Sequence, residues 1–135
     1  MRKKKYNNTK VEFDGHIFDS TRERDRYLFL KGKLKEGVIK DLELQPEFEL
    51  LPNQYETQIK VLKTKTKEVQ VLVERSLSYR ADFIYTLVAT GRRIVEDVKI
   101  KKSLLPQEYI IKRKLLLYLY EFKVYQVFTP TQELP

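Results

Sequence analysis

The 135-residue chain contains no cysteine and only one histidine, His16. Without cysteine there can be no disulfide bond, thiolate zinc site or cysteine nucleophile. A single histidine also makes a histidine-based metal cluster or a Ser-His catalytic triad very hard to assemble. Any metal ion would therefore be held mainly by oxygen ligands, which suit hard cations such as Mg²⁺ or Mn²⁺. His16 itself is expected to be a surface or half-buried side chain.

The chain also lacks any long hydrophobic run. No apolar stretch approaches the roughly 20 residues of a membrane-spanning helix, and no apolar segment follows the basic start MRKKKYNN. We therefore expect a cytoplasmic location and no membrane partner. With no repeat and no Gly/Ser-rich linker, the length predicts one domain, residues 11–135, after a basic arm at residues 1–10. That arm is either a solvated tail or a phosphate contact.

Charge and aromatic side chains are, by contrast, plentiful. Lys and Arg number 27 against 19 acids, which gives a formal net charge of +8, and there are seven Phe and nine Tyr. A hydrophobic fraction of 41% is typical of a folded protein and not of a disordered chain. The positive charge favours a polyanionic partner, although charge alone is equally compatible with an ordinary basic protein.

Two helices are expected. Residues 11–18 predict a hairpin with Asp14-Gly15 at its turn, and residues 21–36 then show helical apolar spacing. Ser20 and Glu23 have the spacing of a capping box at the start of this first helix. The second helix follows Pro106, a residue suited to a first helical turn. We expect its apolar stripe to pack on a sheet; the stripe consists of Ile111, Leu115, Leu119 and Phe122.

Several strands lie between these helices and one follows them. A strand is expected between Pro46 and Pro52. Residues 55–63 and 68–76 alternate around the polar turn TKTK and predict a protruding hairpin. This hairpin is interpreted as a dimer surface, a DNA-reaching element or neither; if it enters a groove, its tip lysines would contact phosphates. Those lysines are Lys63, Lys65 and Lys67. The runs 78–87 and 92–100 and a short closing strand, VYQVF, complete the set.

Carboxylates occupy the middle of two of these strands. If the hairpin of residues 78–100 closes around Ala89 and Thr90, residues whose numbers sum to about 179 pair, so Asp82 would face Asp97. A turn that used Gly91 would shift this register by one. Because strand side chains alternate, Glu96 would lie on the other face and outside any site with Asp97.

Two like charges at paired positions destabilise a sheet unless something offsets them. A divalent cation between Asp82 and Asp97 would do so, with Lys99 adding positive charge one pleat along. Such a set suits phosphodiester cleavage, in which a metal acts as a Lewis acid and a lysine stabilises developing negative charge. The alternative is an exposed sheet edge whose acids pair with the nearby bases, namely Arg80, Arg92, Arg93 and Lys99.

The motif pair Asp82 and Asp97-Val98-Lys99 resembles the PD-(D/E)XK nuclease superfamily. The wider pattern is similar to small phage-encoded endonucleases or Holliday-junction resolvases within it. The matching segments, in order, are DGHIFDSTRERDRYL, LELQPEFEL, YRADFIY, IVEDVK and YIIKRKL. The resemblance implies an α/β (α+β) fold with a central mixed β-sheet flanked by helices, a restriction-endonuclease-like core of order αβββαβ, and an extra β-hairpin.

The resemblance also implies roles for individual residues. Asp82 and Asp97 would ligate Mg²⁺ or Mn²⁺, Lys99 would be the catalytic lysine, and Glu23 would be the acid that the first helix contributes. A competing role for Glu23 is the capping box alone. DNA contacts are expected from Lys112 and Lys114, which are otherwise solvated lysines on a helix, and from Gln45, which is otherwise a strand-start residue.

The sequence departs from the family pattern in two places. Ile100 stands where the family commonly has glycine, and a few extra residues, LLPQE, precede the second helix. Both differences bear on how a phosphate backbone approaches the site, and hence on the shape of the substrate.

Three functions follow as hypotheses. The first is a metal-dependent DNA endonuclease, resolvase-like on four-way or other branched DNA in phage recombination or replication, acting in the host cytoplasm as a homodimer. The second is a non-catalytic nucleic-acid-binding protein that retains a nuclease fold. The third is a phage protein-interaction factor, which the net charge of +8 disfavours.

Overall fold

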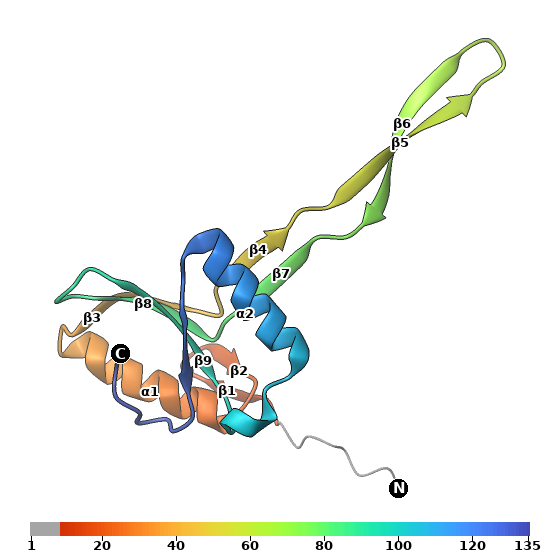
Figure 1. Cartoon of the computed structure of the whole chain (residues 1–135). Helices are drawn as coiled ribbons and strands as arrows, with labels where there is room; N and C mark the ends of the chain where they lie inside the picture. Colours follow the sequence, from red (N-terminus) through yellow and green to blue (C-terminus); the bar gives the residue numbers. More distant parts are fainter. Residues whose placement is uncertain (1–8) are drawn as a thin grey trace, which may run out of the picture.

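The computed structural model describes residues 9–135, which form a mixed α/β structure (Figure 1). The elements in chain order are β1 (Val11–Phe13), β2 (His16–Phe18), α1 (Thr21–Lys35), β3 (Ile39–Leu44), β4 (Glu47–Leu51), β5 (Gln54–Val61), β6 (Thr66–Glu74), β7 (Leu77–Arg80), β8 (Phe83–Leu87), β9 (Arg93–Val98), the 3₁₀ helix η1 (Lys102–Leu104), α2 (Gln107–Tyr120) and β10 (Val124–Val127). The expected basic arm at residues 1–10 lies outside the described residues except for Thr9 and Lys10, which are exposed.

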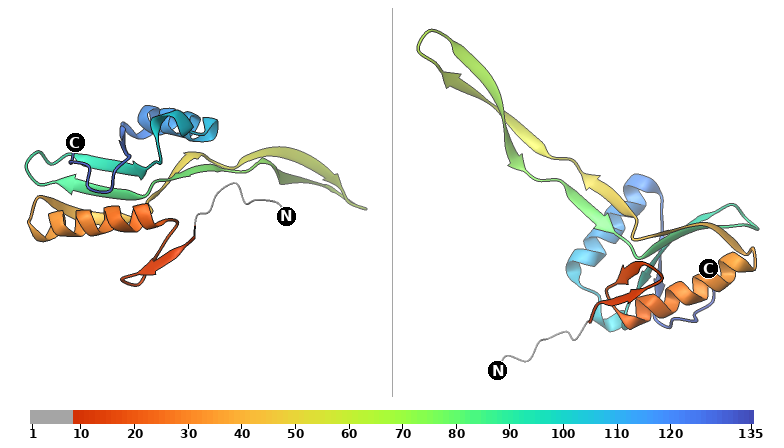
Figure 2. Two further views of the ribbon diagram at one scale, coloured as in Figure 1. Left: turned by 90° about the horizontal axis from the view of Figure 1, so that it is seen from below. Right: turned by 180° about the vertical axis from the view of Figure 1, so that it is seen from behind.

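The centre of the molecule is a four-stranded mixed sheet in the order β10-β9-β8-β3. β8 runs antiparallel to both β3 and β9, whereas β10 is parallel to β9. The helices α1 and α2 lie on opposite faces of this sheet (Figure 2, left). The expected central mixed sheet flanked by helices is therefore confirmed.

Each face of the sheet has its own hydrophobic core. Under α1 the buried residues include Phe18, Leu30, Phe83 and Tyr85. Under α2 they are a different set, namely Leu50, Tyr79, Ala81, Ile84, Val95, Tyr109, Leu116 and Val124. Because successive residues of β8 and β9 serve opposite cores, the centre of the sheet is apolar on both sides and its polar residues are confined to a few positions.

The register of β8 and β9 is the one that the sequence predicts. Phe83 pairs with Glu96, Ile84 with Val95 and Tyr85 with Ile94, and each pair sums to 179. Gly91 has a left-handed backbone (φ 71°) in the connecting loop without shifting this register. The pairing therefore continues outward from Phe83 and Glu96 toward Asp82 and Asp97.

A long two-stranded ribbon leaves this body. β4 pairs with β7, and the same two chain segments continue into the antiparallel pair of β5 and β6. Figure 1 shows this ribbon extending far beyond the rest of the molecule. Every residue of β5 is exposed, and on β6 only Val69 and Val71 are half-buried. The expected protruding hairpin is confirmed, and its residues add almost nothing to either core.

Local sequence signals explain the first helix and the first turn. Asp14 and Gly15 both have positive φ, as the two-residue turn between β1 and β2 requires. Ser20 Oγ accepts a hydrogen bond from the backbone N–H of Glu23 (3.2 Å) and so caps α1. The helix ends before Gly37, whose φ of 77° suits glycine.

The expected apolar stripe on α2 is partly wrong. Ile111 and Leu119 are 48% and 47% exposed, whereas Tyr109 and Leu116 are buried. The segment LLLYLY is apolar on nearly all sides, so spacing alone could not select the face that packs on the sheet. Among residues 9–135, no helix has the length and apolar character needed to cross a membrane.

Candidate active site

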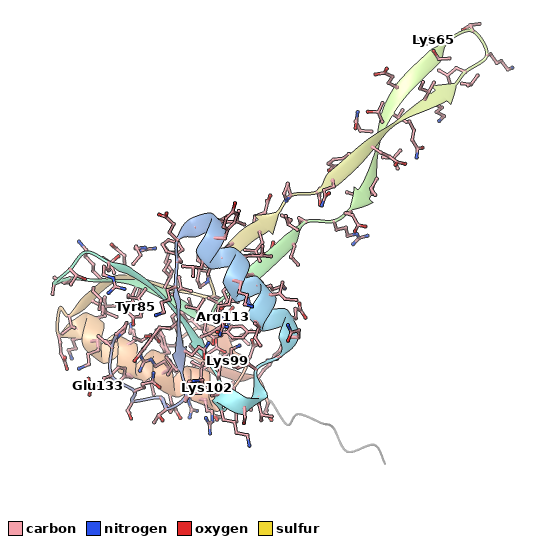
Figure 3. The ribbon with its side chains drawn as sticks, in the orientation of Figure 1. Lys65, Tyr85, Lys99, Lys102, Arg113 and Glu133 are labelled. Atoms are coloured by element: carbon pink, nitrogen blue, oxygen red, sulfur yellow. The ribbon has the colours of Figure 1, made fainter. Side chains whose placement is uncertain are left out.

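A polar cleft opens where β7 passes into β8, beside the end of β9 and the first turns of both helices. All four expected catalytic residues line it, and they come from three different parts of the chain. These residues are Glu23, Asp82, Asp97 and Lys99. Figure 3 shows Lys99 near the start of α2, on the side of the sheet that this helix covers. The fold thus brings together side chains that lie up to 76 positions apart in the sequence.

Asp82 occupies the break between β7 and β8. Its backbone N–H donates to the carbonyl of Glu96 (3.1 Å), and its Oδ2 accepts from the backbone N–H of Val98 (2.7 Å). Both the backbone and the carboxylate of Asp82 are therefore held against β9. This position places it beside Asp97, as the register predicts.

Asp97 is 4% exposed and lies on the α2 side of the sheet. Its Oδ2 accepts a hydrogen bond from the Tyr79 hydroxyl and lies 3.7 Å from the Lys99 ammonium. Lys99 in turn sits 3.9 Å from the centre of the Tyr109 ring, at cation–π distance. Two tyrosines therefore orient the aspartate and the lysine that the motif supplies.

The acids of the cleft are electrostatically unfavourable to one another. Burial raises the pKa of Asp82 well above its usual range, and the nearby Asp97 and Glu23 raise this pKa further. Burial also raises the pKa of Asp97, although Lys99 and the Tyr79 hydroxyl oppose that rise. The charged forms would be favoured by a positive charge placed among them, which is what a bound cation provides.

Glu23 divides its two carboxylate oxygens between two environments. Oε2 accepts a hydrogen bond from the backbone N–H of Asp19 (3.2 Å), next to the helix cap. Among residues 9–135, Glu23 Oε1 is one of two buried side-chain oxygen or nitrogen atoms without a hydrogen-bond partner; the other is the Tyr109 hydroxyl. Burial raises the pKa of Glu23. The start of α1 therefore uses one carboxylate oxygen of Glu23 and leaves the other buried without a partner, in a residue that lines the cleft.

Glu96 lies on the opposite face, as strand alternation predicts. It forms a fully buried ion pair with Arg26, in which two guanidinium nitrogens donate to the two carboxylate oxygens at 2.7 Å each. The Tyr85 hydroxyl also donates to this carboxylate. Because Arg26 lies one turn after Glu23 on α1, the pair fixes α1 against β9 and so positions Glu23 at the cleft.

These residues fit a hard cation with few protein ligands. In residues 9–135, no three His, Cys, Asp or Glu side chains are grouped closely enough to form a complete metal cage. Mg²⁺, however, is commonly held by one or two carboxylates, with water and substrate phosphate completing its shell. Asp82 and Asp97 are a neighbouring pair of carboxylates of this kind, and Glu23 lines the same cleft.

The three expected DNA-binding residues lie in different places. Lys112 lines the cleft, where its ammonium is 2.9 Å from Glu108. Lys114 lies outside the cleft, in a shallow hollow between α2 and β10. Gln45, at the end of β3, donates from its side chain to the carbonyl of Ile17 (3.0 Å). His16 is exposed, as expected, with its ring edge-on to Tyr27.

A family model described as "Protein of unknown function (DUF1064)" matches residues 3–129. The chain belongs to this family. No curated protein and no solved structure matches it. The family description names no activity, so the function of this DUF1064 member has to be argued from its cleft.

Sequence reasoning missed several residues of that cleft. Tyr79 and Tyr109 belong to the core under α2 and also line the cleft. Arg80, also in the lining, pairs with Asp19 at 3.1 Å. The extra LLPQE segment contributes as well, because Pro106 lines the cleft. A usable signal was the tyrosine three residues before Asp82, in a strand whose other residues are half-buried or exposed.

Proposed function

We propose that this protein is a metal-dependent DNA endonuclease that hydrolyses phosphodiester bonds with Mg²⁺ or Mn²⁺. The observation that carries the proposal is the convergence of Asp82, Asp97 and Lys99 on one cleft, which Glu23 also lines. The order of the core elements is consistent with it. If β1, β2, the 3₁₀ helix and the β4–β7 ribbon with its hairpin are set aside, α1, β3, β8, β9, α2 and β10 remain, and these would correspond to the αβββαβ core that the resemblance implies.

Each cleft residue would have a distinct task. Asp82 and Asp97 would hold the cation, which when bound supplies Lewis acidity toward the phosphate. Lys99 would place its ammonium against the phosphate oxygens or the attacking water and stabilise developing negative charge. Tyr79 keeps the Asp97 carboxylate in place, and the Tyr109 ring keeps Lys99 from folding away. Lys112 lies where it would meet the DNA backbone.

The proposal also includes branched DNA as the substrate and a homodimer as the active form. Two symmetric cuts in a four-way junction need two sites related by a twofold axis. The outer face of α2 supports a pairing of two copies, since Tyr118 is 83% exposed and Ile111 and Leu119 are about half exposed. These three side chains share one side of the helix because they are spaced by seven and eight residues.

The testing experiment is cleavage of labelled four-way-junction and linear duplex DNA with Mg²⁺, Mn²⁺ or a chelator. We expect cutting only with a cation, faster on the junction, and lost in Asp97→Asn. Asp25→Asn, which changes an exposed carboxylate of α1 that pairs with Arg24, is the matched control and should cut normally. Tight binding without cutting under either cation would instead indicate a DNA-binding protein on a nuclease-like fold.

A further inference from the structure

The hairpin of β5 and β6 ends in a basic tip. Residues 60–67, KVLKTKTK, contain four lysines and no acid. These lysines are Lys60, Lys63, Lys65 and Lys67, and all of them are exposed. In residues 9–135 none of the four forms an ion pair, because the acids of the hairpin lie nearer its base. The tip is therefore a concentrated positive charge without a partner in the molecule.

The pairing of the two strands makes this charge more unfavourable. Lys60 lies directly opposite Lys67 in the ladder, and like charges at paired positions destabilise a hairpin. An isolated two-stranded ribbon is at best marginally stable in water. An anion at the tip would offset both costs.

The geometry points to a second DNA contact. We propose that the hairpin tip binds the phosphates of duplex DNA about one helical turn away from the phosphodiester held in the cleft. A two-stranded β-ribbon fits the major groove of B-DNA, about 12 Å wide. Lysines at its end reach phosphates on either side and position the DNA without reading its sequence. The inference rests on the proposed function, because it names the shape of that function's substrate.

The distance follows from the continuity of the ribbon. The chain runs from Lys67 through β6 and β7 to Tyr79, whose hydroxyl contacts Asp97. These 12 residue steps (79 − 67) span about 40 Å if fully extended. One turn of B-DNA is about 34 Å long. Figure 3 shows Lys65 at the far end of the hairpin, well separated from Lys99.

The lysines argue against a second copy of the chain as the occupant of the tip. The hairpin also exposes apolar side chains, namely Tyr55, Ile59, Val61, Leu62, Leu72 and Val73, but a twofold pairing of two tips would bring eight lysines together. Duplex phosphate matches both the charge and the separation from the cleft.

The test is DNA binding in chelator, where no cleavage occurs, so its result does not depend on the nuclease proposal. Duplexes of about 7 base pairs, which span less than one helical turn and are closed by a loop to keep them paired, and of about 40 base pairs are titrated into the full chain at several salt concentrations. A longer duplex offers more positions at which the protein can bind, and this alone raises the apparent affinity. The wild type should bind the longer duplex more tightly than this effect explains, because only the longer duplex reaches both cleft and tip. Replacing all four tip lysines by glutamine should abolish this gain, weaken binding of the long duplex at least about tenfold, and reduce the slope of log K against log salt by about 3 to 4.

The matched control replaces four exposed lysines of the body, Lys31, Lys35, Lys40 and Lys123, by glutamine. It removes the same charge and should preserve the gain with length. Equal losses in the two variants, or an unchanged gain in the tip variant, would overturn the proposal. So would a tip variant that binds DNA normally but changes from dimer to monomer, because the hairpin would then be a protein interface. DNA binding that depends on the hairpin, without cleavage when Mg²⁺ or Mn²⁺ is added, would support this inference and contradict the nuclease proposal.

Discussion

The Tyr79 hydroxyl donates a hydrogen bond to Asp97 Oδ2, which joins the ribbon strand β7 to the acid at the end of β9. This bond lowers the pKa of Asp97 against the rise that burial causes. It also fixes which way the carboxylate faces. Groups that orient a metal-ligating carboxylate commonly affect metal affinity or activity about 10- to 100-fold.

Tyr79→Phe should therefore weaken activity without removing a ligand. We expect about a tenfold fall in cleavage at neutral pH, and a shift of the acidic limb of the pH–rate profile to higher pH, because Asp97 holds its proton longer. Rates measured across the pH range at saturating Mn²⁺ give both quantities. Tyr118→Phe is the control, because Tyr118 is exposed and does not line the cleft. A Tyr79→Phe profile that superimposes on that of the wild type would contradict the role.

Asp82→Asn should stabilise the metal-free protein at neutral pH and above. The raised pKa of Asp82 means that, between the unfolded and folded pKa values, the folded state binds more protons than the unfolded chain. The contribution of this group to the free energy of unfolding is then lost as the pH rises from the pKa of the unfolded state to the pKa of the folded state. In chelator at about pH 8 we expect the variant to melt about 2–5 °C higher than the wild type, with a smaller difference at acidic pH.

Added Mg²⁺ should reverse this order. The cation stabilises the wild type by binding the folded state, whereas Asp82→Asn loses that gain. Asp25→Asn serves again as the control and should respond to Mg²⁺ like the wild type. A wild type that shows no shift in melting temperature with Mg²⁺ or Mn²⁺ would argue against a cation between Asp82 and Asp97.

The buried pair of Arg26 and Glu96 should matter chiefly for stability, since neither side chain lines the cleft. Glu96→Gln leaves the Arg26 charge buried without its anion, and breaking such a pair costs about 3–5 kcal/mol. Replacing both residues by apolar ones should cost less than replacing one. Denaturant unfolding of each single variant and of the double variant measures the free energy of unfolding that each change costs. Arg24→Met, which removes a half-buried arginine whose ion pair with Asp25 lies near the surface, is the control and should change stability by less than about 1 kcal/mol.

Placing a charge on the outer face of α2 should separate the proposed dimer. Tyr118→Glu puts a carboxylate on an 83% exposed position, so the fold should be unaffected while the apolar contact between copies is lost. Light scattering should give the mass of two chains for the wild type and of one chain for the variant. Leu28→Glu, at an exposed position of α1, should stay dimeric. A wild type that is monomeric at all accessible concentrations would rule out this interface.

Several features of the fold and site were predictable because they depend on short-range rules. The register that pairs Phe83 with Glu96 follows from strand alternation and the length of the loop between β8 and β9. The cap of α1 follows from the Ser20 and Glu23 spacing. The separation of Glu96 from Asp97 follows from the two-residue period of a strand.

Other features depend on tertiary contacts that a sequence pattern does not carry. β3 was not expected as a separate strand, since Asp41 has φ 54° and the pairing with β8 shifts between Lys40 and Glu43, which disturbs the alternation. The side of α2 that packs on the sheet was ambiguous because the second half of that helix, LLLYLY, is apolar on nearly all sides. The roles of Tyr79 and Tyr109 depend on where β7 and α2 cross the end of β9, which only the assembled fold determines.

Lys99 offers the most direct test of the central claim that this cleft cuts DNA. The measurement is single-turnover cleavage of a labelled four-way junction by Lys99→Gln and by the wild type at saturating Mn²⁺, with DNA binding measured in chelator. The account predicts a rate lower by about 10²–10³ with binding within a few-fold of the wild type. Cleavage at the wild-type rate, or cleavage by both proteins without any cation, would contradict it.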